Sequence, residues 1–317
     1  MTDEVRITAL GTGRSFSRLA QANTGWLVEL GNGDVFVLDF GFGSFQRFAA
    51  LEIPMSRLTA LFASHLHTDH VGDFGAYWMA ARVGGRAEPL SFLGPSGGRE
   101  EFGFARFARH QLLSYGWDIE SRRGVLPEAG AGAAITEFPW DARDVVYQHN
   151  GVTVSSFPAV HIHDGAVGYR LDWNGRSIVY SGDTAPNRFL VDAARGVDVL
   201  IHETSNGQGG DFVHTDAVEL GRILAMVAPR LGIAFHFNND VGTRQSVADR
   251  IRRSYGGELL LAEDLATIRL SDKDITVSTA TVSAYSWPNT DGPGTNPVED
   301  ETAELSPWLR EARLFLS

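Results

Sequence analysis

Short runs in which apolar side chains dominate or alternate with polar ones recur along this chain and predict β-strands. The tight-turn sequence Gly31-Asn32-Gly33-Asp34 joins two of the runs and is typical of a hairpin. The predicted strands cover residues 5–10, 25–30, 35–40, 58–64, 152–157, 168–173, 177–181, 197–202, 231–235, 258–262 and 266–270.

Apolar residues at helical spacing predict helices between these strands, at residues 44–51, 74–83, 186–195 and 245–255. A further helix follows from a stripe of Ala217, Leu220, Leu224 and Val227. Thr215 is the predicted N-cap of that helix, and Pro229 marks its exit. Two similar halves of mixed strands and helices predict an α+β fold of two packed sheets with helices outside.

Two segments fall outside this pattern. Residues 97–147 form an insertion rich in aromatic residues, for which a cap over a site and a separate hydrophobic cluster are equally good interpretations. After residue 282 the chain is rich in proline, glycine, asparagine and acidic residues, which is typical of an extension or linker. We therefore expect one domain at residues 1–282 and a C-terminal extension at 283–317, whose residues 306–316 form a short docking helix.

Composition narrows the class of protein. A chain of 317 residues with 43% hydrophobic and 21% charged residues can bury one large core or two smaller ones. Its apolar runs are too short for a membrane span and its N-terminus is acidic, so we expect no membrane association and a cytoplasmic protein. Cysteine is absent, which leaves His, Asp and Glu as the strong metal donors. The formal charge of −12 disfavours nucleic acid as a partner.

The sequence His65-Leu66-His67-Thr68-Asp69-His70 places four potential metal ligands in one turn after a predicted strand. Imidazole nitrogen and carboxylate oxygen together suit zinc. Three further donors, His161, Asp183 and His236, each follow the end of another predicted strand, where ligands can be held rigidly. His163 is a rival for His161, whereas His110, His149 and His202 are expected to be structural.

The combined pattern resembles the metallo-β-lactamase superfamily, which implies a four-layer αββα sandwich with a two-metal site at the edge of its sheets. By this resemblance His65, His67 and His161 hold one metal ion. Asp69, His70 and His236 hold the other, and Asp183 bridges them. The resemblance rests on the motifs Leu10-Gly11-Thr12-Gly13, His65 to His70, His161, Ser181-Gly182-Asp183-Thr184, Ile201-His202-Glu203-Thr204, His214-Thr215 and His236.

Within the superfamily, the sequence Gly168-Tyr169-Arg170 and the later motifs are similar to the branch of transfer-RNA 3′-processing endonucleases and arylsulfatase-like hydrolases. The endonucleases insert a long RNA-gripping arm between the Gly-Tyr-Arg strand and the Ser-Gly-Asp loop. Here residues 171–180 are a plain hairpin with Asn174-Gly175 at its tip. The missing arm favours a small-molecule substrate, and by analogy with the branch we expect a homodimer.

These observations predict a zinc-dependent hydrolase in which two Zn²⁺ ions, with Mn²⁺ or Fe²⁺ as substitutes, generate hydroxide from a shared water. We expect an ester-like or otherwise activated small substrate, aromatic or xenobiotic in kind. One alternative is a phosphodiesterase or RNA 3′-end endonuclease. Another is a di-iron redox protein, which His67 disfavours because the di-iron members carry Glu at this position. The resemblance implies that Glu203 and His214 protonate the leaving group, with a helix-start role for His214 as the alternative. Asp69 would align the hydroxide.

Overall fold

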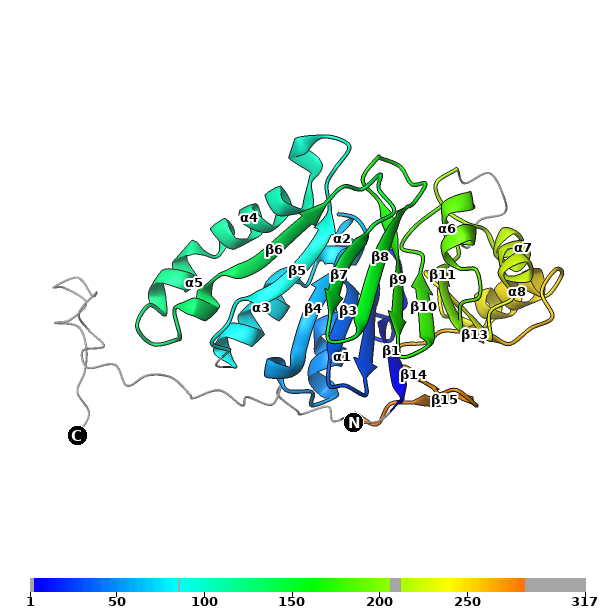
Figure 1. Ribbon diagram of the computed structural model, residues 1–317, viewed down its shortest axis with the longest axis horizontal. Helices are drawn as coiled ribbons and strands as arrows, with labels where there is room; N and C mark the ends of the chain where they lie inside the picture. The colour runs from blue at the N-terminus through cyan, green and yellow to red at the C-terminus, as the bar shows by residue number, and fades with distance from the viewer. Residues whose placement is uncertain (1–2, 85, 206–211, 283–317) are drawn as a thin grey trace.

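The computed structural model describes residues 3–84, 86–205 and 212–282, and in this part of the chain two β-sheets pack face to face. In Figure 1 the green strands of the second sheet pass in front of the blue strands of the first at the centre of the molecule. The first sheet has eight strands in the order β15-β14-β1-β2-β3-β4-β5-β6. The second has seven strands in the order β13-β12-β11-β10-β9-β8-β7.

The first sheet contains β1 (Val5–Gly11), β2 (Gly25–Leu30), β3 (Val35–Phe40), β4 (Leu58–Phe62), β5 (Leu90–Pro95), β6 (Ala133–Phe138), β14 (Ala266–Leu270) and β15 (Ile275–Thr279). The second contains β7 (Val145–His149), β8 (Val152–Pro158), β9 (Val167–Trp173), β10 (Arg176–Tyr180), β11 (Val199–Glu203), β12 (Leu231–Phe235) and β13 (Leu259–Leu261). The helices are α1 (Ser44–Ala50), α2 (Thr68–Val71), α3 (Phe74–Val83), α4 (Phe104–Ser114), α5 (Gly116–Ser121), α6 (Arg188–Ala193), α7 (Ala217–Val227) and α8 (Val241–Ile251). Three short 3₁₀ turns cover Met55–Arg57, Glu100–Phe102 and Ala129–Ala131.

The main hydrophobic core lies between the two sheets, because alternate side chains of each strand point toward the facing sheet. Trp26 of β2 and Phe235 of β12 meet there edge to face, with ring centroids 5.6 Å apart. Phe36 and Phe62 of the first sheet are part of the same buried group as Tyr169 of the second. The burial of these large rings fixes how the two sheets face each other.

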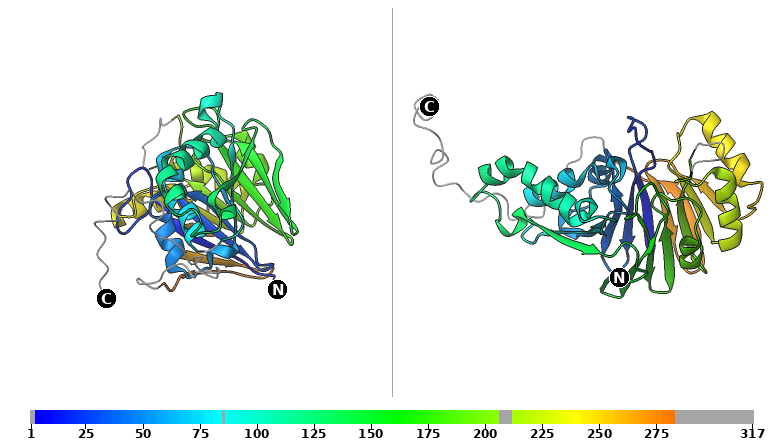
Figure 2. Two further views of the ribbon diagram at one scale, coloured as in Figure 1. Left: turned by 90° about the vertical axis from the view of Figure 1, so that its left-hand side faces the viewer. Right: turned by 90° about the horizontal axis from the view of Figure 1, so that it is seen from above.

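Helices cover the outer face of each sheet. Phe48 of α1, Trp78 of α3 and Phe104 of α4 are buried against the first sheet. Leu190 of α6 and Leu220 of α7 are buried against the second sheet, together with α8. The right-hand view of Figure 2 shows the cyan and the yellow-green helices at opposite ends of the paired sheets. The predicted αββα sandwich is therefore confirmed.

Three local predictions need correction. The N-cap of α7 is Asp216 rather than Thr215, because the Asp216 carboxylate accepts the main-chain N–H groups of Val218 and Glu219 in a capping box. Helix α8 begins at Val241, four residues before the predicted start, because Asp240 caps it through the N–H of Thr243. Strands β5, β6, β7 and β15 were not predicted, and β6 and β7 lie at the outer edges of the two sheets.

The aromatic segment at residues 97–147 divides its side chains between several places. Phe104 is fully buried in the outer core, and Tyr115 stacks on Trp78 with ring centroids 5.3 Å apart. Phe102 and Phe107 instead line a pocket beside the histidine cluster. The prediction of a C-terminal extension with a docking helix lies outside the described residues. No described helix is long and apolar enough to cross a membrane.

Candidate metal centre

Strand ends bring the predicted ligands to one edge of the sandwich. Strands β3 and β4 are parallel, as are β10, β11 and β12, and β8 runs in the same direction as β10 because both are antiparallel to β9. The carboxyl ends of parallel strands lie at the same edge of a sheet. The chain beyond these ends carries His65, His161, Asp183 and His236.

The local backbone at this edge is unusual. His236 has φ of 69°, a left-handed conformation that costs a non-glycine residue about 1–3 kcal/mol and that is common at functional sites. Gly182 precedes Asp183 with φ of 58°, and a Cβ atom there would lie 2.8 Å from the carbonyl oxygen of Val167. Only glycine fits this turn, so the turn fixes where Asp183 leaves the strand.

The first group of donors contains His65, His67, His161 and Asp183, whose ligand atoms all lie within 4.8 Å of one another. His67 Nδ1 lies 2.9 Å from His65 Nε2 and 3.2 Å from His161 Nε2. His65 Nε2 lies 4.0 Å from Asp183 Oδ2. Donors about 2.0–2.2 Å from a tetrahedral ion lie roughly 3.3–3.6 Å from one another. The three distances lie on either side of this range, so shifts of a few tenths of an ångström would let these side chains share a cation.

The second group contains Asp69, His70 and His236. His236 Nε2 lies 3.4 Å from Asp69 Oδ2 and also 3.4 Å from Asp183 Oδ2. His70 Nε2 lies 3.4 Å from Asp183 Oδ1 and 3.8 Å from Asp69 Oδ2. Asp183 Oδ2 therefore lies near donors of both groups and Oδ1 lies near His70, so the carboxylate stands between the two groups, as a bridging ligand requires.

Hydrogen bonds on the far side of the rings set the tautomers of three histidines. His161 donates from Nδ1 to the carbonyl oxygen of Val213 at 2.8 Å. His70 Nδ1 lies 2.6 Å from the Asp39 carboxylate, and His65 Nδ1 lies 3.0 Å from Ser64 Oγ. Each bond places the proton on Nδ1 and leaves the lone pair of Nε2 free to face the other donors, which is how protein histidines are held for metal binding.

Protonation favours the same conclusion for His65, His161 and Asp69. Burial and the neighbouring imidazoles hold the pKa of His65 well below its ordinary value, and burial lowers the pKa of His161 to about 4. Burial raises the pKa of Asp69, but the hydrogen bond from His236 and the charge of His70 outweigh it and lower the pKa to about 2. At neutral pH the first group thus offers neutral imidazoles and the second an ionised carboxylate. Burial lowers the pKa of His70, but the charges of Asp183 and Asp39 outweigh it and raise this pKa well above its ordinary value, so a cation bound at His70 Nε2 would replace a proton there.

Two polar atoms at the centre test whether this donor set fits cations. Among the described residues, His70 Nε2 and Asp183 Oδ1 are buried without a hydrogen-bond partner, although they face each other. A buried acceptor atom left unpaired costs about 1–3 kcal/mol, and a cation between the two donor groups would remove that cost. The donor chemistry, the spacing and these unpaired atoms therefore fit a pair of metal ions.

Asp39 supports the cluster from behind and was missed in the sequence. Its carboxylate accepts from Ser64 N–H at 2.6 Å, Ser64 Oγ at 2.7 Å, His70 Nδ1 at 2.6 Å and the Tyr180 hydroxyl. It is fully buried, with φ of 55°. A carboxylate near the end of the otherwise apolar strand β3 was the signal that could have found it.

Glu203 and His214 form a second pair at the edge of the cluster. His214 Nδ1 lies 3.0 Å from Glu203 Oε1, which also accepts the main-chain N–H groups of Thr184 and Thr215. Burial raises the pKa of Glu203, and the hydrogen bond from His214 opposes this rise. His214 forms a third group of possible donors with Asp183 and His236, and its Nδ1 is 3.9 Å from Asp183 Oδ2. The shorter contact of this Nδ1 with Glu203 favours pairing with the carboxylate over metal binding.

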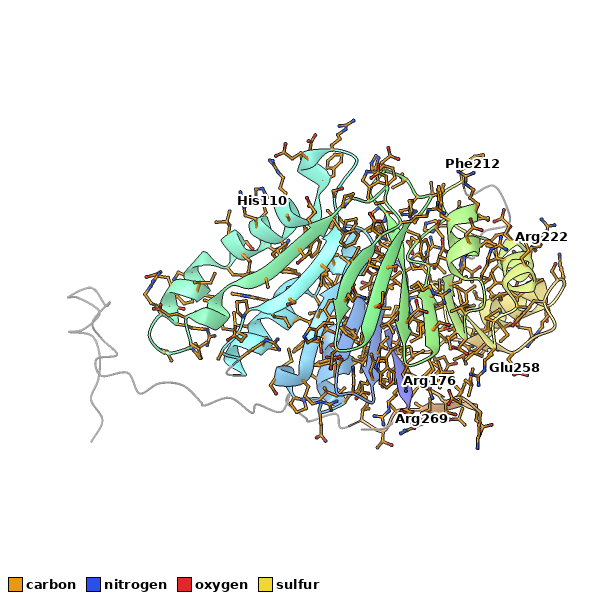
Figure 3. The ribbon with its side chains drawn as sticks, in the orientation of Figure 1. His110, Arg176, Phe212, Arg222, Glu258 and Arg269 are labelled. Atoms are coloured by element: carbon orange, nitrogen blue, oxygen red, sulfur yellow. The ribbon has the colours of Figure 1, made fainter. Side chains whose placement is uncertain are left out.

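The remaining histidines lie elsewhere. Among the described residues the donor groups contain His161 and not His163. His202 is buried in β11 and donates from Nδ1 to the carbonyl oxygen of Glu203, which agrees with a structural role. His149 ends β7 and is exposed. His110 lies on α4, as Figure 3 shows.

Comparison with known proteins places this site in a family. Residues 19–225 match the family described as the metallo-β-lactamase superfamily. The chain belongs to the metallo-β-lactamase superfamily. It is accordingly a metal-dependent hydrolase. The metallo-β-lactamase fold protein YhfI from Bacillus subtilis superimposes with a TM-score of 0.68 at 20% sequence identity, covering 84% of this chain and 100% of that one, and shows the fold alone.

Two relatives within the superfamily are named ribonuclease Z. The protein from Mycobacterium avium (strain 104) is 32% identical over 207 residues, 62% of this chain and 69% of that protein. The protein from Mycolicibacterium gilvum (strain PYR-GCK) is 26% identical over 274 residues, 85% of this chain and 87% of that protein.

These relatives contradict two predictions. The prediction of a hydrolase for small ester-like molecules is wrong, and so is the prediction that nucleic acid is an unlikely partner. The two predictions rested on the missing arm and on the net charge. Strands β9 and β10 do pair directly, with Arg176 opposite Trp173 next to the tip. The absence of the arm does not exclude RNA as a substrate, however, because other surfaces of a protein can bind RNA. Net charge is a sum over the whole chain and does not describe the edge where substrate binds.

Proposed function

We propose that this protein is a metal-dependent phosphodiesterase that cleaves RNA endonucleolytically near its 3′ end. The observation that carries the proposal is the likeness to enzymes named ribonuclease Z, which extends over 85% of the chain. The site is compatible with it. Two divalent cations would bring four positive charges against the two carboxylates of Asp69 and Asp183. The remaining positive charge favours an anionic phosphodiester over a neutral ester.

We assign one cation to His65, His67 and His161 and the other to Asp69, His70 and His236, with Asp183 shared between them. Neutral imidazole with carboxylate in four-donor groups suits zinc best, and nitrogen and oxygen donors also accept manganese or iron. We therefore infer Zn²⁺ as the resident ion. Metal analysis of the protein as purified, by mass spectrometry, tests both the identity and the expected ratio of two ions per chain.

When bound, such a pair of ions lowers the pKa of a water molecule and stabilises the charge that develops on the phosphate. Asp69 would accept a hydrogen bond from the attacking water and orient it. The new bond joins the water oxygen to phosphorus, and the bond from phosphorus to a ribose oxygen breaks. His214 Nε2 would give its proton to that oxygen, while Glu203 holds Nδ1 and stabilises the protonated ring.

A substrate panel tests the proposed activity. We would incubate the zinc-loaded full chain with a labelled precursor transfer RNA carrying a 3′ trailer, a DNA of the same sequence, and a carboxylic ester. The expected result is one cleavage event near the 3′ end of the RNA and little turnover of the DNA or the ester. Ester turnover in the absence of RNA cleavage would overturn the proposal.

The expected homodimer is not tested by any of these observations and stays a prediction from the resemblance. Light scattering on the purified chain would measure its mass against the 34.5 kDa of one protomer. A mass near that of a single chain at the working concentration would contradict it.

A further inference from the structure

A pocket opens beside the first donor group and has no role in the chemistry described above. Its volume is about 400 Å³, within the range of small-ligand sites. His65, His67 and His161 form its inner end, whereas Asp69, His70, His214 and His236 are not among the residues that line it. A substrate group in this pocket would therefore adjoin the first metal position, away from the Glu203–His214 pair.

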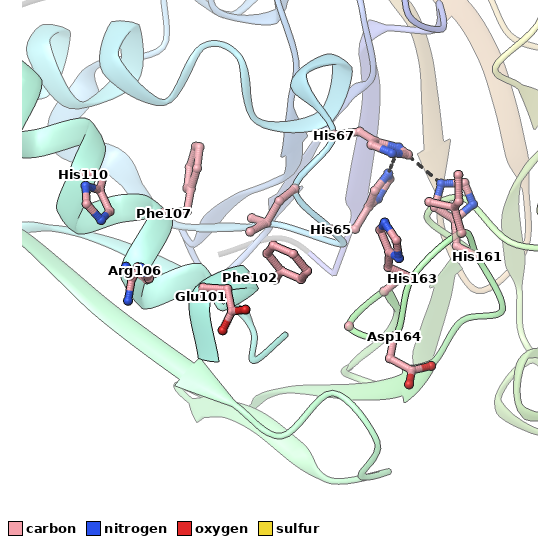
Figure 4. A pocket seen from close by; sticks show the side chains of 14 residues that line it. His65, His67, Glu101, Phe102, Arg106, Phe107, His110, His161, His163 and Asp164 are labelled. Atoms are coloured by element: carbon pink, nitrogen blue, oxygen red, sulfur yellow. Dashed lines mark hydrogen bonds between the residues drawn. The ribbon is translucent and has the colours of Figure 1, made fainter. Parts of the chain in front are cut away.

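Two aromatic rings face each other in the pocket. Phe102, in the turn before α4, and His163, in the loop after β8, have ring centroids 6.0 Å apart and planes inclined by 28°. Figure 4 shows this pair next to His65 and His67, with Phe107 to the left of Phe102. Phe102 is 45% exposed and His163 is also exposed, so the contact contributes little to the stability of the fold.

A flat guest would fit between the two rings once they move slightly apart. Carbon atoms of stacked groups lie about 3.5 Å apart, so a ring between two others needs about 7 Å between the outer planes. The 6.0 Å between the ring centroids is an upper bound on the gap between the rings, so the gap must widen by at least about 1 Å. Both rings lie on loops rather than strands, and the loops are joined where Gly98 N–H donates to the carbonyl oxygen of Asp164 at 3.0 Å. A small rotation of the Phe102 or His163 side chain, with the joined loops held in place, would admit the guest.

The other walls favour a neutral guest over a charged one. Leu66, Phe107 and Ile162 supply apolar surface. Glu101 and Asp164 bring two carboxylates and Arg106 brings one guanidinium, so the lining carries one more negative than positive side chain when its histidines are neutral. This balance disfavours a second phosphate in the pocket. A heteroaromatic ring with polar edges matches both the flat slot and these polar groups.

We propose that this pocket is a nucleobase subsite, in which the base of a nucleotide next to the scissile phosphate inserts between Phe102 and His163. The inference rests on the proposed function, because RNA supplies the base, and it adds a substrate-positioning site to it. The phosphate would lie at the metal positions, and the base would lie in the pocket beyond His65, His67 and His161. Phe102 and His163 thus position the substrate and do not touch the reacting atoms.

A binding experiment tests the subsite without catalysis. Adenosine 5′-monophosphate and ribose 5-phosphate differ only by the base, and titration calorimetry would compare their affinities for the zinc-loaded full chain. We expect the nucleotide to bind about ten-fold more tightly. Phe102→Ala should abolish that preference, and Phe102→Trp should retain it. Trp117→Ala, which removes an exposed ring outside the pocket, is the matched control and should leave the preference intact. Equal affinities for the two probes would overturn the subsite.

Kinetics on RNA separate this inference from the proposed function. Substrates would carry a single abasic nucleotide on one side or the other of the cleaved bond. With the wild-type chain, one of the two should raise KM about ten-fold while kcat falls much less, and in Phe102→Ala the two substrates should no longer differ. Efficient cleavage that ignores both abasic positions overturns the subsite but not the nuclease. A preference for the nucleotide probe without cleavage of any RNA overturns the nuclease but not the subsite.

Discussion

The metal-donor groups and the pocket wall beside them are built in opposite ways, although they share His65, His67 and His161. Most of the donor side chains are buried and follow the ends of central strands. Phe102 and His163 are exposed and lie on a turn and a loop. The difference indicates that the fold itself fixes where the cations bind, whereas substrate selection is left to side chains that the fold does not need.

Support from surrounding groups follows the same division. Asp39 holds His70, and a main-chain carbonyl holds His161, so the donor rings have little freedom. The pocket rings are held by each other, by the Arg99 guanidinium over Phe102 at 5.5 Å and by the tie between their loops. Changes at the buried edge should therefore alter metal binding or turnover, and changes at the wall should alter substrate preference alone.

The largest expected effect comes from the Glu203–His214 pair. His214→Ala removes the proposed proton donor, and Glu203→Gln removes the carboxylate that orients it, so each should lower kcat by about 10²–10⁴-fold. Neither residue belongs to the two assigned ligand sets, and metal content per chain should stay at the wild-type value. Steady-state kinetics and metal analysis on the same samples measure both quantities.

His149→Ala is the matched control for this experiment, because His149 is exposed at the end of β7 and outside the donor groups. It should retain wild-type kcat and metal content. A loss of metal from His214→Ala in proportion to its loss of turnover would assign His214 to the structure of the site and not to proton transfer.

A smaller effect is expected at Asp39, the support of the second donor group. Asp39→Asn removes the charge that faces His70 and puts an amide N–H₂ where N–H or O–H donors now point. Loss of such a supporting carboxylate usually weakens metal binding about 10–100-fold. Competition with a chromophoric chelator would measure this affinity. Asp34→Asn, at the turn before β3, is the control and should bind metal as the wild type does; equal affinities in the two variants would contradict the role of Asp39.

The sequence predicted the fold and the seven donor positions for the same physical reason. Strand ends in a two-sheet sandwich converge at an edge, and a dense His and Asp motif after one such end has few other uses. Asp39 was missed because a single acidic residue before Gly41 is also an ordinary way to end a strand. The structure brings the seven donors together, while their metal occupancy stays a prediction that metal analysis can test.

The pocket wall could not be predicted, because the aromatic residues of the insertion do not reveal their exposure. Phe102 and Phe104 lie two residues apart, yet the first faces the pocket and the second is fully buried against the first sheet. The incorrect substrate prediction has a similar cause. The missing arm and the net charge are properties of other parts of the chain, whereas the substrate is selected by loops whose course depends on tertiary packing.

The smallest expected effect is on stability, and it compares two rings of one segment. Phe104→Ala removes a buried ring that packs on β5 at Gly94 and should lower the free energy of unfolding by about 3–5 kcal/mol. Phe102→Ala removes a ring that is 45% exposed and should change it by less than about 0.5 kcal/mol. Urea unfolding of the full chain, followed by fluorescence, would measure both. A cost for Phe102→Ala close to that for Phe104→Ala would show that the fold requires this ring. The distinction between the buried metal donors and a pocket wall that the fold does not need would then fail at Phe102.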